Sequence, residues 1–241
     1  MLVTDEWGFS ALTRRSATDH VLAELRGAIV AGRIRPGAPL RESALARSLG
    51  TGRSAVREAV RQLVQEGLVL YRPNRGTVVR AVTVRDSRDL YLAREVIEVA
   101  AVQQAMEREQ GPDLGPLRDA LKQISIAAAA NDRDAPAGVE LIAADLDFHR
   151  ELVRLAGSTR LSRAHETLAA EAQMLLHHQP VYSPTDYATD HAILLEAISA
   201  RDPEAPERVR EHLRLSSRLI AGELARRDDF IEHVDDHTEE T

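Results

Sequence analysis

The sequence predicts a mainly α protein made of two parts, an N-terminal winged helix-turn-helix and a C-terminal all-α helical bundle. Two observations on periodicity support this fold class. Residues 19–80 contain three short amphipathic segments followed by two β-rich runs, whereas the chain after Val84 shows only helical periodicity and is rich in alanine. Charge supports the same division: residues 1–80 carry 13 Arg against 7 Asp and Glu, and residues 81–241 carry 18 Lys and Arg against 31 Asp and Glu. We therefore expect two domains with different partners.

The first two predicted helices are short and end at glycines. "DHVLAELRGAIVAGRI" has an apolar stripe, with Asp19 as the expected N-cap and Gly32 near its end. "RESALARSLG" follows as a second helix, stopped by Gly50. The residues of this second helix expected to face inward are Ala44, Leu45 and Leu49.

A third helix and a hairpin complete the N-terminal part. The helix is expected from about Arg53 to Glu66, with one apolar face made of Val56, Val60, Leu63 and Val64. "LVLYRP" and "GTVVRAV" are β-rich runs separated by "PNRG", which is a hairpin signal. Three helices followed by a hairpin is the order of a winged helix-turn-helix, which we place at residues 19–80 after an N-terminal extension of residues 1–18.

The second part is predicted to be a bundle of about six helices, joined to the first by a linker at 81–85. The helices are expected at about 86–109, 113–130, 136–156, 160–178, 185–200 and 203–226, with Gly- or Pro-containing breaks between them. We assign residues 86–228 to this domain. The last residues, 229–241, are acidic and poor in apolar side chains, so we expect a frayed or disordered tail.

Composition excludes several classes of protein. The chain of 241 residues has no cysteine, so it has neither disulfides nor a thiolate metal site. No stretch reaches the roughly 20 apolar residues of a membrane span, and the N-terminus lacks an apolar signal region, so we expect a cytoplasmic protein without a membrane partner.

The N-terminal part carries an ordered set of side chains suited to DNA. In a helix-turn-helix the second helix of the pair enters the major groove, where arginines bond guanine edges or phosphates and hydroxyls bond phosphates. The glycine at the hairpin tip permits close approach of the backbone to the minor groove. The residues predicted to contact operator DNA are Arg41, Ser43, Arg53, Ser54, Ala55, Arg57, Arg61, Asn74, Arg75 and Gly76.

A carboxylate and an imidazole lie on the apolar face of one bundle helix. "DLDFHREL" places Asp145 and His149 one helical turn apart, where two ligands can bind one ion. His191 and His212 lie on the apolar faces of two later helices. A single histidine in such a position is more often a satisfied core residue than a ligand, but a buried carboxylate requires a cation or strong donors. One Asp and three His suit a divalent metal ion, zinc first, with nickel, manganese or iron as alternatives.

The remaining histidines show no shared inward pattern and are interpreted as surface or local packing residues. They are His20, His165, His177, His178, His233 and His237.

Arg94, from the first helix of the bundle, is a further polar residue predicted to face inward. Two interpretations stay open. It is half of a buried ion pair, with Glu98 or another acid, or it is the donor for an anionic effector.

The motifs also carry a family resemblance. "G.I.PG..L.E..LA..LG", "R..VREA...L..EGL" and "NRGT.V", spread over some 60 residues, resemble the DNA-binding domain of the GntR superfamily of bacterial transcription regulators. "GTGRSAVREA" departs from that family, which usually has a Val-Ser pair before the arginine and a proline before "VREA". Gly52 therefore replaces a hydroxyl residue that would cap the recognition helix and contact phosphate.

The C-terminal 150 residues resemble the FCD effector domain of the FadR subfamily. "DLDFHRELVRLAGS" is similar to its "D..FH..L...AGN" signature. In metal-binding members the ligands are the Asp and His of this motif and one His on each of two later helices, which implies Asp145, His149, His191 and His212 here. The resemblance also implies a small carboxylate effector, bound through the metal and Arg94.

The combined prediction is a one-component transcription regulator, a repressor, that binds a palindromic operator as a homodimer and responds to a small organic acid or related metabolite. Its main alternative is a metalloenzyme that uses the site of three His and one Asp. A third interpretation makes the metal itself the signal. We predict a regulator and not an enzyme, because no acid–base partner accompanies the four ligands.

Overall fold

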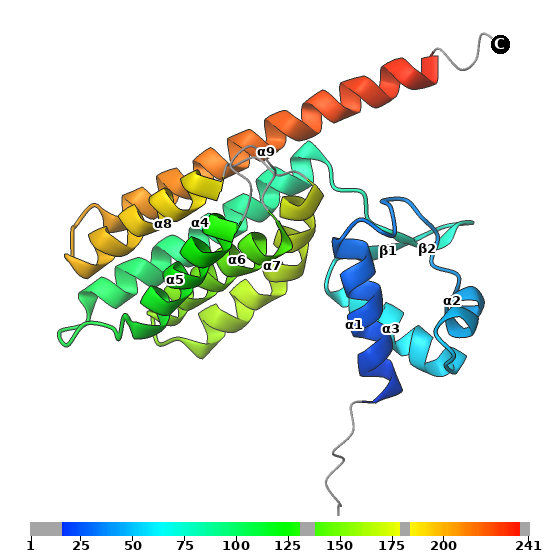
Figure 1. Ribbon diagram of the computed structural model, residues 1–241, viewed down its shortest axis with the longest axis horizontal. Coiled ribbons are helices and arrows are strands. Elements are labelled where there is room, and N and C mark those ends of the chain that lie inside the picture. Colours follow the sequence, from blue (N-terminus) through cyan, green and yellow to red (C-terminus); the bar gives the residue numbers. More distant parts are fainter. Residues whose placement is uncertain (1–15, 131–137, 179–183, 237–241) are drawn as a thin grey trace, which may run out of the picture.

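The computed structural model describes residues 16–130, 138–178 and 184–236. The chain forms a small N-terminal domain and a larger helical bundle, which lie side by side (Figure 1). The N-terminal domain has the order α1 (Ala17–Val30), α2 (Glu42–Ser48), α3 (Arg53–Gln65), β1 (Val69–Arg72) and β2 (Gly76–Val79). This order confirms the predicted winged helix-turn-helix.

Helix α1 begins earlier than expected because its N-cap is Ser16 and not Asp19. Ser16 has an extended backbone, and its Oγ accepts a hydrogen bond from the Asp19 amide at 3.1 Å. The Asp19 carboxylate in turn accepts from the Ser16 amide at 3.0 Å. Asp19 is therefore the third helical residue of a capping box, where its charge also suits the positive end of the helix.

The N-terminal core differs from the sequence prediction at two positions. Ala44 is exposed, and Ala46 is the buried residue of α2. Val64 is 44% exposed, because the buried stripe of α3 runs through Val56, Ala59, Val60 and Leu63 and turns away from it. The apolar pattern thus predicts each helix correctly, but the buried face lies one or two positions away from the predicted one.

The two strands form an antiparallel hairpin in which Arg72 pairs with Gly76. The Arg75 amide donates to the Arg72 carbonyl at 3.1 Å across the turn. Pro73 has the fixed φ that suits the first central position of this turn, and Asn74 takes φ 64° at the second. The wing therefore presents a tight tip of three residues, as "PNRG" predicted.

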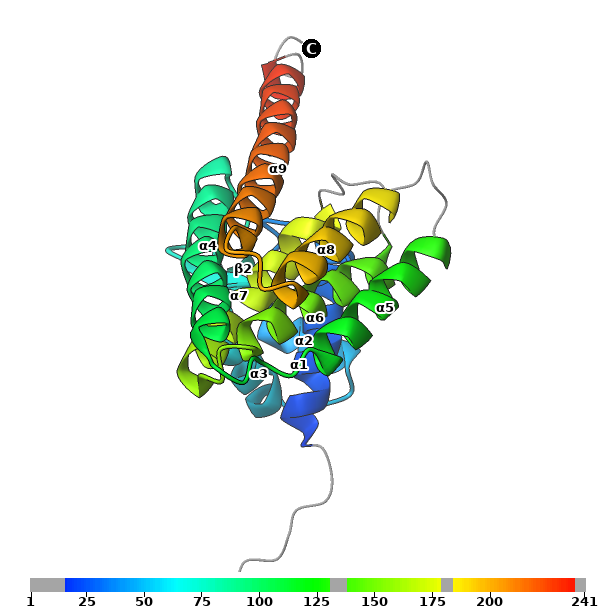
Figure 2. The ribbon, with the colours of Figure 1, turned by 90° about the vertical axis from the view of Figure 1, so that its left-hand side faces the viewer.

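The bundle consists of six helices among the described residues. Their bounds are α4 (Val84–Glu107), α5 (Gly115–Ala130), α6 (Val139–Arg154), α7 (Thr159–His178), α8 (Pro184–Ser199) and α9 (Ala205–Asp236). Figure 2 shows α4 lying along α9 on one side of the bundle, with α5 and α8 on the other side. Helix α6 lies between them, and its Leu141, Phe148 and Leu152 are fully buried.

Two predicted boundaries are wrong. Val84 and Arg85 belong to α4 and not to the linker, because Thr83 caps the helix in a second capping box with Asp86. Residues 229–236, which we expected to fray, continue α9 beyond the bundle (Figures 1 and 2). No glycine or proline follows Gly222, so the sequence contains no residue that would end this helix.

Two other predictions lie outside the described residues, namely the extension at 1–15 and the end of the tail at 237–241. Among the helices that the structure describes, none has both the length and the apolar character needed to cross a membrane.

Candidate metal centre and DNA-binding surface

Three helices of the bundle each direct one histidine to a common point. His149 comes from α6, His191 from α8 and His212 from α9. His149 and His191 are each 1% exposed. The donor atoms of the three imidazoles lie within 4.8 Å of one another, so one ion could be bound by all of them.

The hydrogen bonds of two rings define which nitrogen faces the centre. Nδ1 of His149 lies 2.6 Å from Oε2 of Glu98, and Nδ1 of His191 lies 2.6 Å from the carbonyl oxygen of Tyr187. Because both partners are acceptors, each Nδ1 carries the proton. In a neutral imidazole this leaves Nε2 with a lone pair.

The Nε2 atoms with these lone pairs lie close together. Nε2 of His149 is 3.3 Å from Nε2 of His191 and 3.4 Å from Nε2 of His212. Two deprotonated nitrogens cannot form a hydrogen bond to each other, whereas a shared cation satisfies both. Nitrogen ligands about 2.0–2.1 Å from a tetrahedral zinc ion lie about 3.3 Å apart. The distances from His149 to the other two rings therefore fit ligands of a divalent metal.

Asp145 adds a negative charge to this centre. Its Oδ1 lies 3.0 Å from Nε2 of His191 and 3.9 Å from Nε2 of His149. Burial alone would raise the pKa of Asp145, but its contact with His191, the neighbouring His149 and the charge of Arg94 lower it to about 2. The carboxylate is thus ionised at neutral pH, as a metal ligand must be.

The electrostatics also favour neutral imidazoles. Burial and the charge of Arg94 lower the pKa of His149, against the opposing effect of Glu98. Burial and the two neighbouring histidines hold the pKa of His212 well below its ordinary value. Both side chains are therefore able to bind a metal at neutral pH without first losing a proton.

Glu98 on α4 connects the centre to its surroundings. Its carboxylate accepts from Nε of Arg94 at 2.9 Å and contacts Nδ1 of His149 and Nε2 of His165, the latter at 3.0 Å. Burial would raise the pKa of Glu98, but His149 and Arg94 hold it well below the usual range. A carboxylate bonded to the outer nitrogen of a metal-ligating histidine fixes that ring and raises its basicity.

Sequence reasoning missed two of these contacts. The pair of Arg94 and Glu98 was one expected alternative, but the bonds from Glu98 to His149 and His165 were not anticipated. His165 is 5% exposed and hydrogen-bonded to Glu98, so it is a buried residue packed against α4 and not a surface residue. A signal was present, since Leu161, His165, Leu168 and Ala172 follow one another at helical spacing on one face of α7.

Arg94 faces the same centre with one nitrogen free. Its Nη2 is buried and has no hydrogen-bond partner among the described residues, and its Cζ lies 5.1 Å from the centre of the Tyr91 ring. Burial opposes the charge, but Glu98, Tyr91 and Asp145 raise the pKa of Arg94, so the guanidinium stays charged. A buried, unsatisfied charged donor is costly and suits an anion.

A small cavity lies between these side chains. Its free volume is about 10 Å³, which is room for one ion or one water molecule. The cavity is lined by Tyr91, Arg94, Asp145, His149, Leu176, Tyr187, Asp190, His191, His212, Leu213 and Ser216. The structure thus brings the four predicted ligands and Arg94 to one cavity.

The side chains predicted to contact DNA lie on the surface of the N-terminal domain. Eight of the ten are exposed, and Ala55 and Gly76 are half-buried. Arg57 is held by an ion pair to Glu42 at 3.1 Å, and Arg61 lies 3.4 Å from Glu58. The N-cap of α3 is Gly52, which offers no side-chain bond to the helix.

The wing also exposes two residues that sequence reasoning did not name. Tyr71 is 72% exposed, and Arg72 beside it is also exposed. An aromatic ring and a guanidinium next to Arg75 extend the basic tip along β1. The signal was visible, because "YRPNR" combines them in five residues.

Two family models match the chain. Residues 17–79 match the family described as bacterial regulatory proteins, gntR family, and residues 89–215 match the FCD domain. The two matches coincide with the N-terminal domain and with most of the helical bundle.

Relatives along most of the chain carry regulator names. A protein of Paenarthrobacter nicotinovorans named "Probable D-xylose utilization operon transcriptional repressor" is 32% identical over 83% of this chain and 87% of its own. The HTH-type transcriptional repressor RspR of Escherichia coli (strain K12) is 28% identical over 81% of this chain and 85% of its own. Among solved structures, a GntR transcriptional regulator from Rhodococcus sp. RHA1 covers 86% of this chain and 99% of its own, with 29% identity and a TM-score of 0.73.

Proposed function

The chain belongs to the GntR family of bacterial transcription regulators and carries an FCD domain, and from this premise we propose that it is a repressor controlled through a metal centre in its helical bundle. The family consists of regulators, so the metalloenzyme alternative is set aside. The four ligands would be Asp145, His149, His191 and His212, with zinc as the first candidate ion. We further propose that the protein acts in the cytoplasm as a homodimer on a two-fold symmetric operator.

DNA recognition is proposed for the exposed face of α3 and for the wing. Arg53, Ser54 and Arg57 occupy the first turns of α3, where side chains of a recognition helix reach base edges and phosphates. Arg41 and Ser43 at the start of α2 would bind the backbone, and Asn74, Arg75 and Gly76 would enter the minor groove. Ala55 and Arg61 would complete the surface along α3.

The observation that carries the metal proposal is the approach of the Nε2 atoms of His149, His191 and His212. The first two rings donate from Nδ1 to fixed acceptors, so both Nε2 lone pairs point to the same small cavity. A bound cation would supply a Lewis acid there and an anchor for an anionic ligand.

The effector would be a small carboxylate that meets the metal with one oxygen and Arg94 Nη2 with another. The free nitrogen of this buried guanidinium supports an anionic ligand. The cavity holds only one ion or water molecule as it stands, so an organic acid would have to displace side chains or helices to enter. A ligand that needs such a displacement favours one arrangement of the bundle over another, which is the requirement for allosteric control.

The size of the cavity also favours a second candidate function. A volume of about 10 Å³ suits a metal ion alone, so the metal itself would be the signal. Operator binding with and without a chelator, at constant organic acid, separates the two candidates.

Metal binding is tested by titrating Zn²⁺ into the metal-free full chain by calorimetry. We expect one site per chain in the wild type and loss of that site in His191→Ala. His20→Ala is the matched control, since His20 is exposed on α1 and should leave binding unchanged. Equal Zn²⁺ affinity of wild type and His191→Ala would contradict the proposed site.

Effector binding is tested by a thermal-shift screen of small carboxylates against the zinc-loaded protein, because a ligand that binds only the folded state raises its stability. An active acid should release DNA that the wild type has selected from a random pool. It should have little effect on Arg94→Lys, which keeps the charge but loses the forked guanidinium. If every acid that shifts the wild type shifts His191→Ala equally, the metal-anchored effector site is wrong.

A further inference from the structure

Helix α7 packs against the N-terminal domain and also contacts the surroundings of the metal centre. Met174 of α7 is fully buried, and it lies in the apolar core of the N-terminal domain together with Val21, Leu25 and Leu68. The next two residues, Leu175 and Leu176, instead belong to the core of the bundle. One turn of α7 therefore contributes to both cores.

Polar contacts also connect the two domains beside Met174, at a place that we call the joint. Arg80, which follows β2, bonds Glu171 of α7 at 3.1 Å and Asp86 of α4 at 2.8 Å. These three side chains are each between a quarter and a third exposed, so their charges are only partly screened. Arg80, at the end of the wing, thus forms ion pairs with two helices of the bundle, α7 and α4.

The backbone also approaches α7 closely at this point. Gly67, just after α3, has φ +73°, and a Cβ placed on it would overlap with Oε1 of Glu171. Only glycine adopts this conformation readily and leaves that space free. The end of the recognition helix is therefore set directly against Glu171.

Helix α7 contacts the metal centre at two places, at His165 in its first half and at Leu176 beside Met174. His165 bonds Glu98, whose other oxygen is 2.6 Å from the ring of His149. Leu176 lines the metal cavity itself. His165 and Met174 are nine residues apart, about 13 Å along a helix. If α7 moves as a rigid body when the metal centre is occupied, Met174 moves together with His165.

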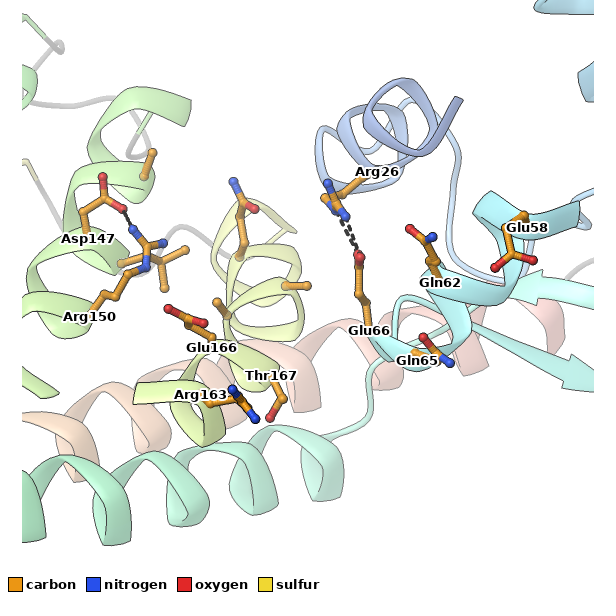
Figure 3. Close-up of a pocket in the computed structure, with 15 residues that line it drawn as sticks. Arg26, Glu58, Gln62, Gln65, Glu66, Asp147, Arg150, Arg163, Glu166 and Thr167 are labelled. Atoms are coloured by element: carbon orange, nitrogen blue, oxygen red, sulfur yellow. Dashed lines mark hydrogen bonds and ion pairs between the residues drawn. The ribbon is translucent and has the colours of Figure 1, made fainter. Parts of the chain in front are cut away.

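Space for a movement exists beside the joint. A cleft of about 800 Å³ separates α1 and α3 from α6 and α7, as Figure 3 shows. Its walls carry charged and amide side chains, among them Arg26, Gln65, Arg163 and Glu166, and Arg26 is bonded to Glu66 of its own domain. Polar side chains therefore make up much of the lining of the cleft.

We propose that α7 is the lever that couples the metal centre to the DNA-binding domain, with Met174 and Glu171 as its coupling residues. The inference rests on the proposed function, since it presupposes that occupancy of the centre alters operator affinity. Binding at His149 moves Glu98 and His165, α7 shifts with them, and the N-terminal domain rotates about Met174 into or out of the cleft. The orientation of α3 towards DNA changes as a result.

The rotation is measured directly with two spin labels on the full chain. The protein has no native cysteine, so labels on Gln65→Cys of α3 and Arg163→Cys of α7 are the only ones present. Both positions line the cleft from opposite sides (Figure 3). We expect the label separation to shift when Zn²⁺ is added to the metal-free protein. The shift should be abolished in Met174→Ala and reduced in Glu171→Ala, with Zn²⁺ affinity unchanged within about twofold.

The same variants are tested on DNA. Coupling between two sites commonly changes affinity by about 5- to 150-fold, and we expect the wild-type ratio of DNA affinities with and without Zn²⁺ in this range. In Met174→Ala the ratio should fall to about 1–2, and Met174→Leu should restore most of it. Thr167→Ala is the matched control, because Thr167 lies on the cleft side of α7 and bonds only its own helix at the Ala164 carbonyl.

Failures of the two proposals are distinguishable. If Zn²⁺ binds the wild type without changing DNA affinity, the metal alone is not the signal. The lever then fails if a carboxylate that binds the zinc-loaded protein also leaves DNA affinity unchanged. If DNA affinity changes in the wild type but equally in Met174→Ala and Glu171→Ala, or with no shift between the labels, the lever alone is wrong. Should Met174→Ala fail to fold, the label shift and the DNA affinity of Glu171→Ala are compared with those of the wild type instead.

Discussion

Glu98 connects the buried polar side chains of the bundle to one another. It accepts from the guanidinium of Arg94 and contacts two imidazoles, and it is completely buried. A buried charge network of this kind is stable only when every partner is present, because a lone buried charge is far less stable than a paired one. Position 98 therefore affects both the stability of the bundle and the orientation of His149.

We predict that Glu98→Gln weakens metal binding and stability together. The amide no longer offers His149 a charged acceptor, and loss of such an outer partner lowers metal affinity by about 10- to 100-fold. Arg94 would lose its counter-charge, which destabilises the fold by about 3–5 kcal/mol. Chelator competition and urea unfolding measure the two effects. Glu107→Gln, at an exposed position of the same helix, should change neither quantity.

We also predict that the metal-free protein is destabilised by mild acid. The native pKa values of His149 and His212 lie below the ordinary 6.5, mainly through burial. Below pH 6.5 the unfolded chain binds protons that the native state does not, so stability falls as pH is lowered, by about 1.4 kcal/mol per histidine and pH unit until the native pKa is reached. Urea midpoints at pH 7.5 and 5.5, with chelator present, test this.

The variant His212→Gln provides the control for this pH dependence. It removes one of the two groups, so its loss of stability on acidification should be smaller than that of the wild type. A wild-type midpoint that is equal or higher at pH 5.5 would contradict the direction of both pKa shifts.

The inward positions of the proposed ligand residues were predictable and their supporting contacts were not. His149 and Asp145 lie on an apolar face at helical spacing, so local periodicity alone directs them inward. The bonds of Glu98 to His149 and His165 join residues 51 and 67 positions apart. Such pairs depend on how α4, α6 and α7 are placed against one another, which no local pattern contains.

At the scale of elements, helix ends show the limits of local patterns most clearly. Ser16 and Thr83 each cap a helix with an aspartate three residues later. Both sequences, "SATD" and "TVRD", fit the capping pattern, but the apolar stripes start later and draw the predicted boundary inward. The break at 131–137 lies outside the described residues.

Helix α3 lacks a side-chain cap, and we predict that Gly52→Ser supplies one. Gly52 has φ −77°, and a Cβ there would meet only Ser54 Oγ at 3.7 Å, so serine fits without strain. A serine hydroxyl at the N-cap stabilises a helix by a few tenths of a kcal/mol relative to glycine. It also adds a donor for a DNA phosphate, so affinity for DNA selected by the wild type should rise. Gly50→Ser, at φ +60°, should lower stability instead.

At the scale of the whole molecule, the two domains do not separate at the linker. Val82 packs against both cores, and Met174 of the bundle completes the core of the N-terminal domain. The charge difference and the change of periodicity predicted two domains correctly. They did not predict that one core includes a side chain from more than 90 residues later in the chain.

We predict that a fragment of residues 1–83 is less stable than the same residues in the full chain. Loss of the buried Met174 side chain leaves a cavity, and such deletions destabilise by about 2–5 kcal/mol. Hydrogen exchange of the α1 and α3 amides, measured in fragment and full chain, reports this difference. Equal protection in both would show that Met174 does not contribute to the N-terminal core.

The buried position of Met174 also limits how this regulator can be recombined. DNA-binding and effector domains are attractive units for building sensors with new outputs, and residue 80 would be the obvious place to join them. A winged helix grafted there would need a space in its apolar core for the Met174 side chain and a glycine opposite Glu171. Without both, the chimera would bind its ligand and its DNA as two independent proteins on one chain.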